Sequence, residues 1–262
     1  MAVAYDRRMS EHVLPASVRV ALWATESFAT GSSLLELPPR ALPGIDLVQG
    51  LIAPLTAWRD LGEPAVLVAL PRPGKLGSLP AGTPELAAAA TAAQECVYAP
   101  GLGSVLVPTL ETYGPDGDQG WSARWASFDA QPVPVHRVEA LDLGQTELGL
   151  RQELVLLTEE LSQVGAPPLA AQAGLQGLRR RMSSGHGPWG LPAGLPPRAL
   201  RVIDLAGTVL ALADAGLEPG QESFDASSTG RRSVLLARLR DLATAALADA
   251  ANVGALHLSR QP

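Results

Sequence analysis

The spacing of apolar residues changes between residues 132 and 142, and this change constrains the fold more than any other feature of the sequence. Before it, short apolar runs of strand length are separated by turn-forming residues; after it, leucines recur at steps of three and four, as in an amphipathic helix. The sequence therefore predicts an α+β fold, with a small antiparallel sheet and helices in the N-terminal part and a mostly helical C-terminal part. We expect a flexible lead-in over 1–12, an α+β part over 13–140 and a helical part over 141–262, which forms either its own domain or one domain on a shared core.

Four segments before the change have the pattern of strands. Residues 65–70 are an apolar run ended by Pro71, and the run has the length and branched side chains of a buried strand. Three further runs follow, at residues 96–99, 104–113 and 121–129. The connector at 114–120 is rich in Gly and Asp and is typical of a hairpin loop, so we predict an antiparallel meander.

Three segments of the N-terminal part are predicted to be helices, at residues 18–28, 46–62 and 84–93. The first of them also has an alternation that would suit a strand. Asp46 is expected to cap the second helix and Pro54 to bend it, because proline removes a backbone hydrogen bond within a helix. Thr83 followed by Pro84 is a strong start signal for the third.

The C-terminal part is predicted to contain four helices. In the first, the stripe from Leu150 to Val164 follows a cap formed by Asp142 and Gln145. A shorter helix is expected over 170–182, and Pro196 and Pro197 open a third that ends at Gly216. Ser228 or Thr229 is expected to cap the last helix, whose inner stripe consists of Leu235, Leu239, Leu242, Ala246 and Ala250.

The charge balance narrows the classes of partner. The chain has 262 residues and a formal net charge of -6, whereas a nucleic-acid binder needs a surplus of Lys and Arg on one face, so no nucleic-acid partner is expected. Lys75 is the only lysine among 20 basic residues, a bias typical of a high-GC bacterial genome. Because we find neither a secretory signal nor an apolar run of about 20 residues, we expect a soluble cytoplasmic protein without a membrane partner.

The motifs of common cofactor and metal sites are missing from the sequence. The lysine of Gly74-Lys75-Leu76-Gly77 precedes the second glycine, unlike that of a Walker loop, and residues 101–103 lack the third glycine of a dinucleotide fingerprint. Cys96 is the only cysteine, which excludes a cysteine-rich zinc site, and we interpret it as a buried, unreactive thiol. The acids at 116–118 are interpreted as a hairpin tip rather than a calcium loop. We therefore expect no metal and no cofactor.

Candidate catalytic residues lie around the end of the last predicted strand. Among the histidines, His136 is the best placed, because it follows the strand that carries Arg124 and Asp129. Asp129 could orient His136 as a general base, with Arg124 nearby, in a metal-independent hydrolase or transferase.

Candidate ligand-binding residues are Trp121, Trp125 and His186. The two tryptophans share one strand face, which is either a stacking platform for a planar ligand or, as we favour, the core face of the sheet. His186 lies in a glycine-rich segment between predicted helices, where it could bind a ligand, although a simple connector is the favoured interpretation.

No motif decides between the functions that remain. We favour a non-catalytic module that binds a protein or a small molecule through the aromatic sheet face or the helical half; the alternative is the enzyme with a site near Asp129 and His136. A nucleic-acid-associated regulator would require Arg179–Arg181 and Arg231–Arg232 to gather on one face. A homo-oligomer also stays open, because periodicity cannot tell whether an apolar stripe faces its own sheet or a second subunit.

Overall fold

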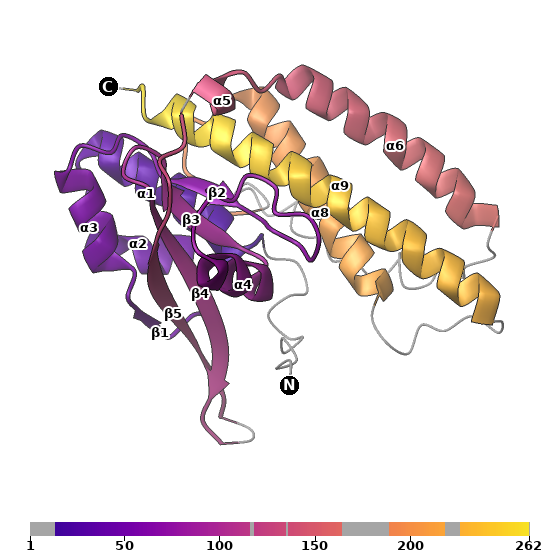
Figure 1. Ribbon diagram of the computed structural model, residues 1–262, viewed down its shortest axis with the longest axis horizontal. Helices are drawn as coiled ribbons and strands as arrows, with labels where there is room; N and C mark the ends of the chain where they lie inside the picture. Colours follow the sequence, from indigo (N-terminus) through magenta and orange to yellow (C-terminus); the bar gives the residue numbers. More distant parts are fainter. Residues whose placement is uncertain (1–13, 116–117, 135, 164–188, 218–225, 262) are drawn as a thin grey trace.

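The computed structural model describes residues 14–115, 118–134, 136–163, 189–217 and 226–261. It confirms the predicted fold class, since a five-stranded sheet with helices in the N-terminal part is followed by a helical C-terminal part. In Figure 1 the sheet and its short helices lie on one side, and the long helices of the C-terminal part cross the other. The predicted lead-in over 1–12 and the predicted helix over 170–182 lie outside the described residues.

The sheet is mixed, with the strand order β1-β5-β4-β3-β2. Its strands are β1 (Leu47–Gln49), β2 (Leu67–Ala69), β3 (Cys96–Ala99), β4 (Ser104–Tyr113) and β5 (Gly120–Asp129). The pairs β2–β3, β3–β4 and β4–β5 are antiparallel, which confirms the predicted meander and the buried strand before it. The far ends of β4 and β5 form a ribbon that projects away from the long helices (Figure 1).

The segment after Asp46 differs from the predicted capped helix. Residues 47–49 form β1, which pairs in parallel with β5, and the helix α3 (Ile52–Asp60) begins only after it. Instead of capping a helix, the Asp46 carboxylate accepts a hydrogen bond from the backbone N–H of Trp121 at 2.8 Å. Pro54 is the third residue of α3, where its missing N–H has no helical partner to lose, so the predicted interior bend was wrong.

The remaining N-terminal helices are α1 (Ala16–Thr30), the 3-10 turn η1 (Leu34–Glu36), α2 (Leu37–Ala41) and α4 (Pro84–Ala93). The predicted cap of α4 is confirmed, because the Thr83 hydroxyl accepts a hydrogen bond from the N–H of Leu86 at 3.3 Å. Helix α1 follows Pro15, which offers no side-chain cap. The buried carboxylate of Glu95 replaces it, accepting the N–H of Ser17 at 2.7 Å, so the start of β3 is tied to the start of α1.

The C-terminal helices are α5 (His136–Glu139), α6 (Leu143–Gln163), α8 (Pro197–Leu217) and α9 (Ala226–Leu258). Asp142 caps α6 as predicted, its carboxylate accepting the N–H groups of Gly144 at 2.7 Å and Gln145 at 3.3 Å. The predicted cap at Ser228 or Thr229 was wrong, because α9 already begins at Ala226. None of the helices in the described part of the chain is long and apolar enough to span a bilayer.

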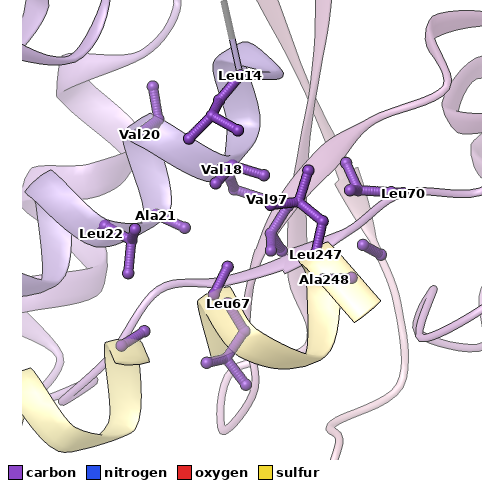
Figure 2. Packing of buried hydrophobic residues seen from close by; sticks show 14 of the residues in the cluster. Leu14, Val18, Val20, Ala21, Leu22, Leu67, Leu70, Val97, Leu247 and Ala248 are labelled. Atoms are coloured by element: carbon purple, nitrogen blue, oxygen red, sulfur yellow. The ribbon is translucent and has the colours of Figure 1, made fainter. Parts of the chain in front are cut away.

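One hydrophobic cluster includes residues from both parts of the chain. Figure 2 shows part of this cluster, with Val18 of α1 and Leu67 of β2 near Leu247 of α9 and with Leu22 further along α1. All four side chains are fully buried. Helix α9 therefore completes the core of the sheet as well as that of the helical part.

Candidate functional site

The three predicted catalytic residues lie on the surface. Asp129 ends β5, Arg124 lies in its middle opposite Thr109, and His136 begins α5 after an extended segment. All three are exposed. Within the described residues, no hydrogen bond or ion pair joins any two of these side chains. The structure thus does not assemble these side chains into one site, and the catalytic hypothesis stays a prediction.

The two predicted aromatic residues differ in exposure. Trp125 is only 3% exposed and belongs to the hydrophobic core, whereas Trp121 is half-buried nearer the end of the ribbon. Gly50, with φ of +73°, lies directly against the backbone of Trp125, and a Cβ at this position would come within 2.2 Å of the Trp125 carbonyl oxygen. The chain directly after β1 therefore approaches the Trp125 backbone so closely that only glycine fits, and the buried Trp125 side chain offers no open platform.

Other predicted residues fall partly outside the described chain. His186 and the run Arg179–Arg181 lie there, so only Arg231 and Arg232, in the second turn of α9, can be placed. Among the described residues, no group of three or more His, Cys, Asp or Glu side chains is arranged to hold a metal ion.

Two titratable groups are buried in the N-terminal part, the carboxyl group of Glu63 and the thiol of Cys96. The Glu63 carboxylate accepts the N–H groups of Gly101 at 2.9 Å and Leu102 at 3.2 Å, which anchors the β3–β4 turn. Burial raises the pKa of Glu63, and these two hydrogen bonds oppose the rise. The Cys96 side chain is fully buried, which confirms the predicted burial of this thiol. Burial raises the pKa of Cys96 to about 12, as expected of an unreactive thiol.

The outer face of α6 carries exposed apolar side chains. The inner face is apolar as well, with Leu150 and Leu157 buried against the other helices. On the opposite side, Leu148 is 49%, Val155 68% and Leu156 53% exposed. Leu148 and Val155 are two turns apart and point the same way, so they form an apolar stripe along the outside of the molecule. In Figure 1, α6 is the outermost of the long helices.

Next to this stripe, three arginines surround a single carboxylate. Glu147 pairs with Arg151 of the same helix at 2.9 Å, and its oxygens lie 3.7 Å from Arg201 and 3.9 Å from Arg198 of α8. Glu147 is 15% exposed, whereas each arginine side chain is more than half exposed. The Asp142 carboxylate and the Arg198 guanidinium both lie against Gly144, so three positive charges face two negative ones, which leaves a small positive excess on a chain that is negative as a whole.

Local sequence features place these groups together. Glu147 and Arg151 are one turn apart on α6, and Arg198 and Arg201 are one turn apart on α8. The cap at Asp142 fixes where α6 begins, and Pro197 opens α8. We call the surface formed by Leu148, Arg151, Val155, Arg198 and Arg201 the α6–α8 surface. In the sequence, this surface is indicated only by the apolar residues of α6 that lie outside its inner stripe. The arginines of α8 lie about fifty residues away, so periodicity could not link them to Glu147.

Two protein families match the chain, and together they cover most of its length. Residues 17–140 match the family described as Rv1486c-like protein, N-terminal domain, and residues 144–248 match the family described as Rv1486c-like protein, C-terminal domain. No curated protein and no solved structure matches the chain significantly.

Proposed function

The chain belongs to the Rv1486c-like protein family, and we propose that it is a non-catalytic module that binds an acidic segment of another protein on the α6–α8 surface. The observation that carries this proposal is the exposed stripe of Leu148 and Val155 beside the three arginines around Glu147. Apolar side chains in the centre of a patch, with arginines beside them, are the composition of protein interfaces.

The chemistry of the surface favours an acidic partner with apolar side chains of its own. Burying Leu148 and Val155 provides a favourable free energy of association, since each square ångström of apolar surface removed from water contributes about 25 cal/mol. The arginines Arg151, Arg198 and Arg201 can each form a charge-assisted hydrogen bond with a carboxylate of the partner. Electrostatic attraction to an acidic segment would also accelerate association and fix the orientation of the partner.

Two other occupants fit the surface less well. Nucleic acid would engage the arginines through its phosphates but would leave Leu148 and Val155 without an apolar partner. A second copy of the chain would bring two arginine clusters toward each other, because a twofold interface uses the same patch on both subunits. An acidic segment of a different protein satisfies both the charge and the apolar stripe.

Site-specific photo-crosslinking tests the proposal. A photoreactive side chain at position 155 is expected to capture one acidic protein in native cell extract, whereas the same side chain at position 61 is not. Leu61 is a matched control, because it is 69% exposed against 68% for Val155 but lies at the end of α3. Reversing the charge of Arg151, Arg198 and Arg201 to Glu is expected to abolish the crosslink, and added salt to weaken it.

The alternative occupants give different results in the same experiment. A crosslinked band of two copies of the chain, or a band removed by nuclease, would contradict the acidic partner. The proposal would also be overturned if positions 155 and 61 captured the same proteins, or if charge reversal left the crosslink unchanged.

A further inference from the structure

A polar stripe runs along one face of the otherwise buried helix α1. Arg19, Trp23 and Glu26 are spaced by four and three residues, so they lie on one side of the helix. This side meets Arg40 of α2, and the indole N–H of Trp23 donates to the carbonyl oxygen of Gly190 at 3.0 Å. The stripe therefore lies where the residues matched by the N-terminal family contact those matched by the C-terminal family.

Arg19 is a buried cation without a carboxylate partner among the described residues. The residue is 6% exposed, and its Nη2 donates to the carbonyl oxygen of Arg40 at 3.1 Å. Its Nε is buried and makes no hydrogen bond. Burial lowers the pKa of Arg19 to about 10, which still leaves the guanidinium protonated at neutral pH. The Nε–H of this buried cation is therefore free to donate to an anion, and a buried charge is most stable when it is paired.

A second arginine lies above this buried one and is weakly held. The guanidinium carbon of Arg40 is 4.7 Å from the centre of the Trp23 ring, and Nη1 is 3.8 Å from a carboxylate oxygen of Glu26. That distance is too long for a hydrogen bond, and the same Glu26 oxygen is buried without any hydrogen-bond partner. The Arg40 side chain is 44% exposed, so its remaining N–H groups are accessible while Nη1 stays beside Glu26.

We propose that Arg19 and Arg40 bind an oxyanion, a carboxylate or a phosphate group of a small molecule, between α1, α2 and Gly190. The unpaired Nε–H of Arg19 donates to one oxygen of the anion, and Arg40 donates to another through N–H groups other than those of Nη1, which stays beside Glu26. The Trp23 ring remains beside the Arg40 guanidinium. This ligand is distinct from the acidic protein proposed for the α6–α8 surface, and it uses none of the residues of that surface.

The shape of the site limits substitution next to it. Gly190 has φ of +58°, and a Cβ at this position would lie 3.6 Å from Nη2 of Arg19. Glycine therefore allows the 189–190 segment to turn while it accepts the Trp23 hydrogen bond. A side chain at position 190 would strain this turn, because its backbone has a positive φ.

Calorimetric titration of the full chain with inorganic phosphate and, separately, with sodium acetate tests the proposal, with sodium chloride keeping the ionic strength constant. We expect saturable binding of at least one anion, with a Kd of about 1 mM or lower, and a change in tryptophan fluorescence that Trp23→Phe removes. Arg40→Ala is expected to weaken binding about tenfold and Arg19→Met to abolish it. Arg238→Ala is the control, because Arg238 is exposed and pairs with Glu153 on other helices.

The two anions also distinguish the sources of the ligand. Binding of phosphate alone indicates a phosphorylated ligand, and binding of acetate alone a carboxylic acid; both support the oxyanion site. If Arg19→Met does not fold, the comparison of anion binding by Arg40→Ala and by Arg238→Ala still tests the proposal, because both arginines are on the surface. The proposal is overturned if neither anion binds saturably, or if Arg40→Ala and Arg238→Ala bind like the unaltered chain.

Discussion

The side-chain amide of Asn252 pairs with the backbone of Val68 as a neighbouring strand would. Its oxygen accepts the Val68 N–H at 2.7 Å, and its nitrogen donates to the Val68 carbonyl oxygen at 2.9 Å. Strand β2 is at the edge of the sheet, and Val68 turns these groups away from β3. Thr25 of α1 acts in the same way two residues earlier, its hydroxyl accepting the Val66 N–H at 2.9 Å. Two helices thereby close a strand edge that would otherwise be open to pairing.

Asn252→Ala is expected to lower the free energy of unfolding by about 2–4 kcal/mol, because it leaves the buried N–H of Val68 without an acceptor. Urea unfolding followed by circular dichroism measures this loss. Ser78 also donates to the Val68 carbonyl oxygen, at 3.3 Å, so the carbonyl keeps one partner in the variant. A loss below about 1 kcal/mol would mean that water reaches this edge and that Asn252 does not seal it.

Thr25→Val tests the second contact of the strand edge with a side chain of nearly the same shape. We expect a loss of about 1–2 kcal/mol, because the Val66 N–H loses its acceptor. Thr208→Val is the matched control, since the Thr208 hydroxyl bonds only to a carbonyl oxygen of its own helix, that of Asp204. The double variant with Asn252→Ala is expected to form aggregates that bind thioflavin T. Equal losses for the two threonines would contradict the edge-sealing role.

Trp125→Ala is expected to destabilise the chain by about 3–5 kcal/mol, as replacement of a buried core tryptophan does. Trp121→Ala, at the half-buried position on the same strand face, should cost about 1–2 kcal/mol. Thermal unfolding of both variants measures the difference. Trp125→Phe should be milder than Trp125→Ala, because the indole nitrogen of Trp125 is buried without a hydrogen-bond partner. Similar losses at 121 and 125 would argue against the core position of Trp125.

Most elements of the fold could be predicted because their signals are local. The capped helix after Thr83 and the meander after Cys96 each follow from spacing and turn residues within about a dozen positions. Strand β1 could not be predicted, since its three residues have no pattern of their own. It exists because β5, more than seventy residues away, offers a parallel edge and because Asp46 binds the Trp121 N–H. Tertiary pairing overrode the apparent helical spacing.

The candidate sites were harder to predict than the fold. Arg19 lies in a helix that the sequence predicts, but an arginine in an amphipathic helix is ordinarily on the surface. Here Arg40 of α2 and Gly190 lie against its guanidinium, and the residue is buried. The arginines around Glu147 come from two helices that lie far apart in the sequence. Asp129 and His136 are close in the sequence, but Asp129 is the last residue of β5 and His136 the first of α5, with an extended segment between them.

Cys96 provides a measure of how often the sheet opens. Because its side chain is fully buried and burial raises its pKa to about 12, native protein is expected to react with a thiol reagent only through opening of the β2–β3 pair. The labelling rate at pH 8 should fall well below that of the urea-unfolded chain. Asn252→Ala should accelerate labelling, since it loosens β2. Rapid labelling of the native chain would show that this edge is not sealed.

The buried carboxylates make stability depend on pH in a defined direction. Burial raises the pKa of Glu95 above its ordinary value of 4.5, although the Ser17 N–H and the charge of Arg72 oppose the rise. The folded chain therefore holds a proton that the unfolded chain has already lost, so the free energy of unfolding falls as the pH rises from about 4.5 to the folded pKa. Glu63 contributes in the same direction.

Glu95→Gln should reduce this fall, because glutamine can still accept the Ser17 N–H through its side-chain oxygen but carries no titrating proton. Urea unfolding of both proteins at several pH values between about 4.5 and 8 measures the difference in slope, which one group can change by at most about 1.4 kcal/mol per pH unit. Glu85→Gln is the control: Glu85 is exposed, and hydrogen bonds from its own N–H and from Thr83 lower its pKa, so its removal should not reduce the fall. Parallel curves for the unaltered chain and Glu95→Gln would mean that Glu95 is ionised in the folded state, with Arg72 compensating its charge across the start of β3.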